Sequence, residues 1–229
     1  MKVLIVAASN TEIKEVRDNL FFTNKLTPNL STFKYGNLNI DILVTGYGSV
    51  FTAFYLTKTL QVHSYDLAIN AGVAGSFDYF LEQGFVVNVT QDQFADLGFE
   101  DKHGFYTLGE KEMINEDSFP FTGEIMRSLG NFEIEEIESM IPVKAITVNT
   151  IHGSQEKIQR LKNKYHAEIE TMEGAAFFYV CLMEKLPFLQ IRSVSNFVEI
   201  PRVENWYLPL ALKNLTKSLM DIFAELRID

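Results

Sequence analysis

The segment EIETMEGAAFFYVCLMEKLPFLQIRSVSNFV, residues 168–198, places polar residues at the ends of one predicted helix and one predicted strand. Its run GAAFFYVCLMEK is apolar on all sides, which predicts a buried helix that begins directly after Glu173. A proline ends this helix, and the apolar run 188–194 predicts a buried strand that leads into Ser195 and Asn196. Ligands of open α/β sheets bind just outside the carboxyl ends of the strands. The segment therefore predicts an α/β fold with a carboxylate and an amide on one side of a sheet, although a helix-terminal acid and a turn asparagine would give the same pattern.

Strands and helices alternate through most of the remaining chain. Continuous apolar runs predict buried strands, helical periodicity follows most of them, and one hairpin is centred on Gly36-Asn37. This alternation predicts a single domain over residues 1–229, an α/β/α sandwich with a central mixed β-sheet. The expected strands are 2–8, 30–36, 37–46, 66–70, 85–90, 143–150 and 188–194, and the expected helices are 11–20, 50–62, 155–164, 174–185 and 204–226. Residues 91–115 have no clear period and predict a functional loop or lid, and residues 119–140 predict a surface helix and a connection.

Composition indicates a globular protein that acts on a small molecule. Of the 229 residues 47% are hydrophobic, and 19 Phe and 9 Tyr can build a large core. The excess of 30 carboxylates over 20 Lys and Arg disfavours nucleic acid and an anionic membrane surface as partners. Cys181, the only cysteine, lies in an apolar run, which fits a reducing compartment and a core role. Because the first apolar run is too short for a signal peptide and no run has membrane-spanning length, we expect a soluble cytoplasmic protein.

Three further strand ends carry residues suited to a ligand site. Glu12 follows the first strand in the first turn of a helix, where a carboxylate can also simply complement the helix dipole. The turn Gly46-Tyr47-Gly48-Ser49 permits close backbone approach to a ligand, although such a G-x-G is more often a tight turn. The segment NAGVAG, residues 70–75, follows another strand, and its small residues, Gly75 among them, can make room for a ligand.

No motif indicates a cofactor or a metal. The sequence has no G-x-G-x-x-G after the first strand, no P-loop, no paired Cys or His ligand spacing and no G-x-S-x-G elbow. His103 and His152 have no partner at metal-ligand spacing, so we interpret them as structural or surface residues.

Taken together, these motifs resemble the nucleoside phosphorylase and nucleosidase superfamily, in the family's order and over nearly the whole chain. They are Glu12, G-Y-G-S from Gly46, N-A-G-V-A-G at 70–75, E-x-M-E-G-A-A at 170–176 and Q-I-R-S-V-S-N at 190–196. The most similar branch contains the bacterial 5′-methylthioadenosine/S-adenosylhomocysteine nucleosidases and the related futalosine hydrolases, which are enzymes of menaquinone biosynthesis. The runs most similar to futalosine hydrolases are A-D-L-G at 95–98, V-N-T-I-H-G at 148–153 and S-N-F-V-E…R-x-E-N-W at 195–206.

The resemblance implies roles in the sugar half of a nucleoside site. Glu12 corresponds to the general base that activates the attacking water, and Arg192 to an arginine near that water. Met172 and Glu173 correspond to the pair that binds the ribose. A carboxylate next to an arginine stays ionised at neutral pH and can accept a proton from water, and an ionised Glu173 accepts hydrogen bonds from sugar hydroxyls.

The base half follows from the same resemblance. The backbone at Thr150 and Ile151 corresponds to a contact with the purine edge, and Thr150 stands where an aromatic stacking residue is expected. Asn196, after Ser195, stands where the methylthioadenosine nucleosidases have an aspartate that handles the purine N7 and the exocyclic amine. Futalosine carries a carboxyphenyl tail, for which the segment around Phe105-Tyr106 or the region of Trp206 can supply an apolar wall.

The amide at position 196 determines the predicted substrate. Its NH₂ can donate to the O6 or N7 of a purine, whereas an aspartate would repel O6 and accept from the N6 amine of adenine. This difference favours a 6-oxopurine and predicts a futalosine hydrolase that releases hypoxanthine. The alternatives are a 5′-methylthioadenosine/S-adenosylhomocysteine nucleosidase, a purine nucleoside phosphorylase and a non-catalytic nucleoside-binding protein.

Hydrolysis is predicted over phosphorolysis because phosphorylases of the superfamily bind phosphate through several arginines. Here only Arg17 precedes Arg127, and a carboxylate at Glu12 would repel phosphate. The resemblance further implies a homodimer, a small nucleoside as the partner molecule, and no cofactor.

Overall fold

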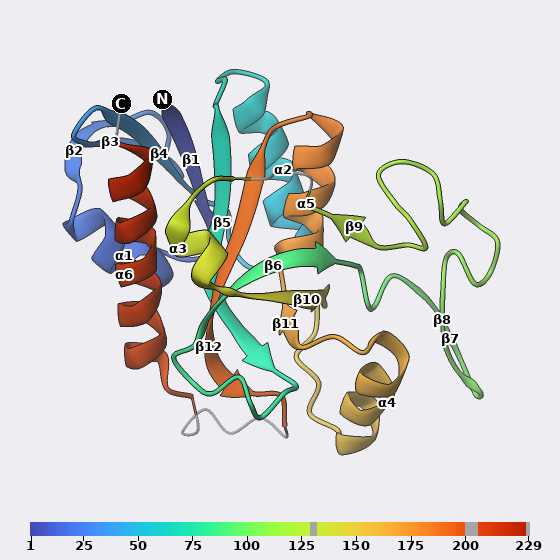
Figure 1. The fold of residues 1–229 in the computed structure, drawn as a ribbon. Coiled ribbons are helices and arrows are strands. Elements are labelled where there is room, and N and C mark those ends of the chain that lie inside the picture. The colour runs from blue at the N-terminus through green and yellow to red at the C-terminus, as the bar shows by residue number, and fades with distance from the viewer. Residues whose placement is uncertain (129–131, 200–205, 228–229) are drawn as a thin grey trace.

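The computed structural model describes residues 1–128, 132–199 and 206–227, and these residues form a ten-stranded sheet with helices on both faces (Figure 1). The strands of this sheet are β1 Lys2–Ala7, β2 Phe21–Lys25, β3 Leu30–Tyr35, β4 Leu38–Val44, β5 Leu67–Ser76, β6 Val86–Asp92, β9 Met126–Arg127, β10 Ile141–Thr147, β11 Ile169–Thr171 and β12 Phe188–Phe197. The helices are α1 Asn10–Asp18, α2 Ser49–Leu60, α3 Glu135–Ser139, α4 Gln155–Tyr165, α5 Gly174–Met183 and α6 Leu208–Leu226.

The sheet is mixed. Its order is β11-β10-β6-β12-β5-β1-β4-β3-β2, with β9 paired to β6. The central pairs β12–β5, β5–β1 and β1–β4 are parallel, whereas β12–β6 and the β3–β4 hairpin are antiparallel. The predicted α/β class with a central mixed sheet is therefore confirmed.

Helices cover both faces because the central strands are apolar on both sides. In β1, Val3 and Ile5 pack into a core with α1, α3 and α6, whereas Leu4 and Val6 pack into a second core with α2 and α5. Figure 1 shows α1 and α6 on one side of the sheet and α2 and α5 on the other. This two-sided burial explains why the strands have continuous apolar runs without alternation.

Several elements differ from the sequence-based expectation. Strand β5 does not end at Asn70 but continues through the glycine segment to Ser76, because β12 pairs with it along that whole length. The irregular segment contains a separate hairpin of β7 Gly98–Asp101 and β8 Gly104–Thr107. Residues 119–140 contribute only β9 and the short α3 in their described part. The expected start of the last helix at Glu204 and the R-x-E-N part of one motif lie outside the described residues.

None of the helices in the described parts of the chain combines the length and apolar character that crossing a bilayer requires.

Candidate active site

A cavity of about 470 Å³ lies where the carboxyl ends of β5 and β12 meet the amino ends of α1 and α5. Seven of the nine predicted site residues line it, although they come from segments far apart in the sequence. They are Glu12, Gly75, Ile151, Met172, Glu173, Ser195 and Asn196. Thr150 is exposed and does not line the cavity, and Arg192 lies behind its wall.

Glu12 is fixed by its own helix terminus and by β5. Ser9 caps α1 and forms a capping box with Glu12, in which the backbone N–H of Ser9 donates to Glu12 Oε2 at 2.9 Å. The backbone N–H of Val73 donates to the other oxygen, Oε1, at 3.2 Å. The side chain is 9% exposed. The carboxylate is therefore held at the cavity wall with its remaining acceptor capacity free for a ligand or water.

Glu173 enters the cavity from the residue before α5. Its Oε1 accepts a hydrogen bond of 2.9 Å from the backbone N–H of Gly48. The φ of Gly48 is +95°, a backbone conformation that residues other than glycine adopt only with strain. Oε2 of Glu173 lies 3.8 Å from Arg192 Nη1. Burial raises the pKa of the Glu173 carboxyl, while the charge of Arg192 and the Gly48 hydrogen bond act against this rise.

Arg192 is the largest fully buried side chain and is 1% exposed. Its Nη2 donates a short hydrogen bond to Asn70 Oδ1, and Asn70 in turn donates to the backbone oxygen of Val6 at 2.9 Å. A Cβ built on Gly72 would lie 2.5 Å from Arg192 Nη1 and 2.7 Å from Glu12 Oε1. The guanidinium therefore lies next to Gly72, near both Glu12 and Glu173, and it does not line the cavity.

Asn196 lies at the other end of the cavity, on β12 next to the end of β5. Ser195 Oγ lies 2.8 Å from Asn196 Oδ1, and Asn196 Nδ2 donates to the backbone oxygen of Phe197 at 3.0 Å. This arrangement fixes the amide with Nδ2 as a donor, and the second hydrogen on Nδ2 remains available to a ligand. The absence of a side chain at Gly75 lets Val198 and Asn196 pack against its backbone, since a Cβ there would lie 2.9 Å from Val198 Cγ2 and 3.3 Å from Asn196 Nδ2.

Sequence reasoning gave no role to three polar residues that also line the cavity, Tyr47, Glu170 and Thr171. Glu170 is the first residue of the E-x-M-E-G motif, and this position was the sequence signal that could have identified it as a site residue. By sequence alone, however, a glutamate in a three-residue strand cannot be distinguished from a surface acid. It is 7% exposed, and its Oε2 has no hydrogen-bond partner among the described residues. Burial raises its pKa to about 7.

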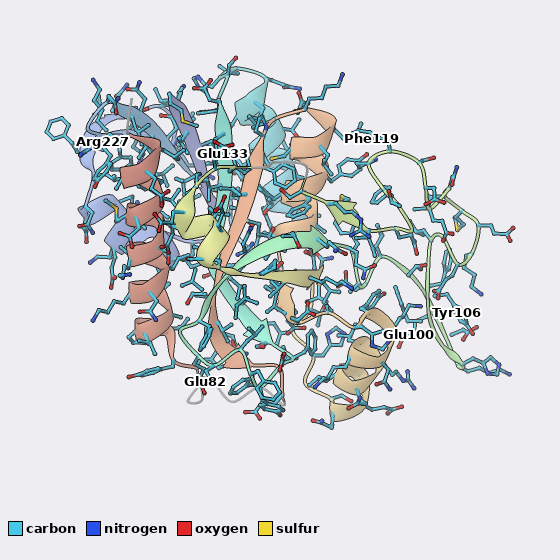
Figure 2. All side chains as sticks on the ribbon, in the orientation of Figure 1. Glu82, Glu100, Tyr106, Phe119, Glu133 and Arg227 are labelled. Atoms are coloured by element: carbon cyan, nitrogen blue, oxygen red, sulfur yellow. The ribbon has the colours of Figure 1, made fainter. Side chains whose placement is uncertain are left out.

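The two regions predicted to supply an apolar wall line different cavities. Trp206 lines the cavity, whereas Phe105 lines a separate cavity of about 580 Å³ between the β7–β8 hairpin and α4, together with His103 and His152. Figure 2 shows Glu100 and Tyr106 on this hairpin, away from the central sheet. Within the described residues, no group of three His, Cys, Asp or Glu has the arrangement of a metal site.

Comparison with known proteins places the chain in a family. The profile described as Phosphorylase superfamily matches residues 2–221, and the chain therefore belongs to this superfamily.

The relatives divide between two activities. The futalosine hydrolase of Thermus thermophilus is 28% identical over 192 residues, which are 80% of this chain and 80% of that protein. The 5′-methylthioadenosine/S-adenosylhomocysteine nucleosidase of Colwellia psychrerythraea is 25% identical over 241 aligned positions, covering 99% of this chain and 97% of that protein. These relatives are nucleosidases, that is, N-glycosyl hydrolases, in agreement with the predicted enzyme class.

Solved structures share the fold. The futalosine hydrolase of Helicobacter pylori superposes with a TM-score of 0.78 at 17% identity, over 98% of each chain. The Colwellia psychrerythraea nucleosidase in complex with adenine superposes with a TM-score of 0.79 at 20% identity, over 99% of this chain and 96% of that one.

Proposed function

We propose that the protein is a futalosine hydrolase, which cleaves the N-ribosidic bond of futalosine with water and releases hypoxanthine and dehypoxanthine futalosine in menaquinone biosynthesis. The observation that carries the proposal is Asn196, whose amide faces the cavity with Nδ2 as a donor. A donor at this position suits the O6 and N7 acceptors of hypoxanthine and is mismatched to the N6 amine of adenine. The T. thermophilus relative supports the same choice.

The sugar half of the cavity supports the chemistry. Cleavage of the C1′–N9 bond passes through an oxocarbenium-like state, so the site must bind the sugar and present a water to C1′. We assign the ribose hydroxyls to Glu173 and to the backbone of Met172, and the attacking water to Glu12, which takes its proton. Arg192 acts as a positioning residue, because its guanidinium lies 3.8 Å from the Glu173 carboxylate and does not line the cavity. Ile151 and Gly75 border the base.

Water rather than phosphate is the proposed nucleophile. The cavity wall contains the carboxylates of Glu12 and Glu173, which repel a phosphate dianion. Among the described residues, the buried cation beside them is Arg192, which already interacts with Glu173 and Asn70. We therefore expect a cleavage rate that does not depend on added phosphate; a ribose 1-phosphate product would contradict a hydrolase.

The alternative is a 5′-methylthioadenosine/S-adenosylhomocysteine nucleosidase. The alignment with the C. psychrerythraea nucleosidase covers 99% of this chain, and this coverage supports the alternative. The two functions require opposite hydrogen-bonding groups at the purine edge, so one comparison separates them.

The test measures kcat/KM for hypoxanthine release from futalosine and for adenine release from methylthioadenosine. We expect the wild type to favour futalosine, and Asn196→Asp to lower the ratio of futalosine to methylthioadenosine cleavage by at least about 100-fold. Asn37→Asp, in an exposed hairpin turn, is the matched control and should leave the ratio unchanged. Preference of the wild type for methylthioadenosine would overturn the proposal.

We further propose that the protein is a cytoplasmic homodimer. The start of α2 exposes Val50, Phe51 and Phe54, and Tyr47, which lines the cavity, is exposed beside them. A second copy of the chain that packs on this apolar surface would shield these side chains from water next to the entrance of the cavity. Light scattering should give twice the chain mass of 26.1 kDa, and a monomer mass would contradict the assignment.

A further inference from the structure

Glu170 is a third carboxyl group in the cavity, and neither the sugar nor the water requires it. It is 7% exposed and lines the cavity, and its Oε2 has no hydrogen-bond partner in the described parts of the chain. A buried carboxyl oxygen without a hydrogen-bond partner destabilises the fold, because it has lost its contact with water and gained none in return. An unpaired group of this kind inside a ligand cavity points to a contact that forms only when the ligand is bound.

The sheet places Glu170 next to Asn196. Glu170 on β11 pairs with Gly75 on β5, and Gly75 in turn pairs with Asn196 on β12, so one glycine separates the two side chains across three strands. A Cβ on Gly75 would lie 2.9 Å from Val198 Cγ2, 3.3 Å from Asn196 Nδ2 and 3.4 Å from Glu170 Cγ. The side chains of Glu170 and Asn196 therefore both lie next to Gly75, and both residues line the half of the cavity assigned to the base.

Glu170 is separate from the charged network of the sugar half. The other titratable side chains that face this cavity are Glu12 of α1, Tyr47 before α2 and Glu173 before α5. Arg192 of β12 contacts Glu173 and Asn70, and its charge does not contribute to the raised pKa of Glu170. Burial alone raises the pKa of Glu170 to about 7. The side chain can therefore carry a proton at neutral pH and is well matched to donate it.

A purine leaves as a neutral base only if it gains a proton, and Asn196 cannot supply one because an amide has no proton to release in this pH range. We propose that Glu170 is the general acid that protonates N7 of the departing 6-oxopurine, while Asn196 donates a hydrogen bond to its O6; this inference rests on the proposed nucleosidase function.

The Glu170 proton moves to N7 as the electron pair of the C1′–N9 bond moves into the purine. The water oxygen bonds to C1′, and the water gives its proton to Glu12. Afterwards Glu12 releases that proton to solvent and Glu170 regains one, so the enzyme returns to its starting state and the net reaction consumes one water.

The experiment compares Glu170→Gln with the wild type on two ribosides. One is futalosine, or methylthioadenosine if the wild type cleaves only that; the other is 4-nitrophenyl β-D-riboside, whose nitrophenolate departs without protonation. We expect Glu170→Gln to lower kcat on the purine nucleoside by at least about 100-fold and to change kcat on the nitrophenyl riboside by less than about threefold. Glu168→Gln is the matched control, because the Glu168 carboxylate binds the backbone N–H of Lys144 at 2.7 Å outside the cavity.

A pH profile gives a second readout. In the wild type, kcat should decline as pH rises through about 7, where Glu170 loses its proton, and Glu170→Gln should lack this decline. An equal loss on both ribosides, an unchanged kcat on the purine nucleoside, or a decline that persists in Glu170→Gln would each overturn the assignment. Failure of the wild type to release hypoxanthine is a different result, because it contradicts the choice of substrate and leaves the two-riboside comparison intact.

Discussion

Glu12 combines a structural and a proposed chemical role in one side chain. Its Oε2 accepts from Ser9 N and Oγ, at 2.9 and 3.1 Å, and its Oε1 accepts from Val73 N. A glutamine retains the capping box, because its carbonyl oxygen can still accept from Ser9. Its NH₂, however, would face the N–H of Val73, and it cannot take a proton from water.

We therefore expect Glu12→Gln to lower kcat by at least about 100-fold, with a fall in the thermal midpoint of only a few degrees. Turnover of futalosine and thermal unfolding, measured on the same preparation, test this prediction. Glu15→Gln, on the exposed side of α1, is the control and should match the wild type in both. Full turnover in Glu12→Gln would refute the base assignment while leaving the fold assignment untouched.

At the scale of elements, β5 sets the spacing of the site through its glycines. Gly72 leaves just enough room for Arg192 Nη1 and Glu12 Oε1, which would lie 2.5 and 2.7 Å from a Cβ at that position. An alanine there must displace the guanidinium or the carboxylate, and displacements of about 1 Å in an active site cost about 100-fold in rate.

Gly72→Ala should therefore lower kcat about 100-fold. The control is Gly153→Ala, where a Cβ would meet no atom within 4 Å, so its kcat should equal that of the wild type. Steady-state assays that measure kcat of both variants test this prediction. A normal kcat in Gly72→Ala would show that the Glu12 carboxylate and the Arg192 guanidinium can move apart without loss of activity.

The elements also explain what the sequence could and could not predict. Strand β12 was predictable because its apolar run is continuous, and α5 because all sides of it are apolar. Strand β2 was not predicted, because FFTNK is exposed at every position and has neither an apolar run nor an alternating pattern. The glycine segment of β5 resembled a loop, since pairing with β12 and β11 gives these small residues their strand geometry.

The same distinction holds for the site. Glu12, Glu173 and Asn196 stand at the ends of predicted strands and helices, so their convergence in one cavity could be expected, and their chemical roles stay predictions. Glu170 could not be found in this way, because its burial depends on the pairing of β11 with Gly75. Thr150, predicted to contact the base, is exposed three residues after the end of β10 and does not line the cavity.

At the scale of the whole molecule, a buried carboxyl group away from the cavity links the sheet to α5. Asp92 at the end of β6 is fully buried and accepts hydrogen bonds from Thr147 Oγ1 at 2.9 Å and Gln190 Nε2 at 3.1 Å. It packs directly against Gly174 at the start of α5, where a Cβ would collide with it. Burial raises its pKa from 3.8 to about 7, more than these hydrogen bonds and the charge of Arg192 lower it.

This shift makes the stability of the protein depend on pH with a defined sign. Between pH 4 and pH 7 the folded protein keeps the Asp92 proton that the unfolded chain has already released. The unfolded state then binds fewer protons, so the free energy of unfolding falls as pH rises across this window, by about 1.4 kcal/mol per pH unit for each such proton, and stays level above it. Glu170, with a pKa also near 7, acts in the same direction.

Asp92→Asn should remove the Asp92 part of this dependence. The new NH₂ can donate to Gln190 Oε1, which has no hydrogen-bond partner among the described residues, and no proton need be released on unfolding. We expect the thermal midpoint of the variant to fall less than that of the wild type between pH 5 and pH 8, so that the variant becomes the more stable protein at the higher pH. Asp18→Asn, at an exposed ion pair with Lys14, should follow the wild type across the range. Parallel curves for wild type and Asp92→Asn in calorimetric scans would show that Asp92 is ionised in the folded protein throughout, and that Arg192 and the hydrogen bonds of Thr147 and Gln190 outweigh its burial.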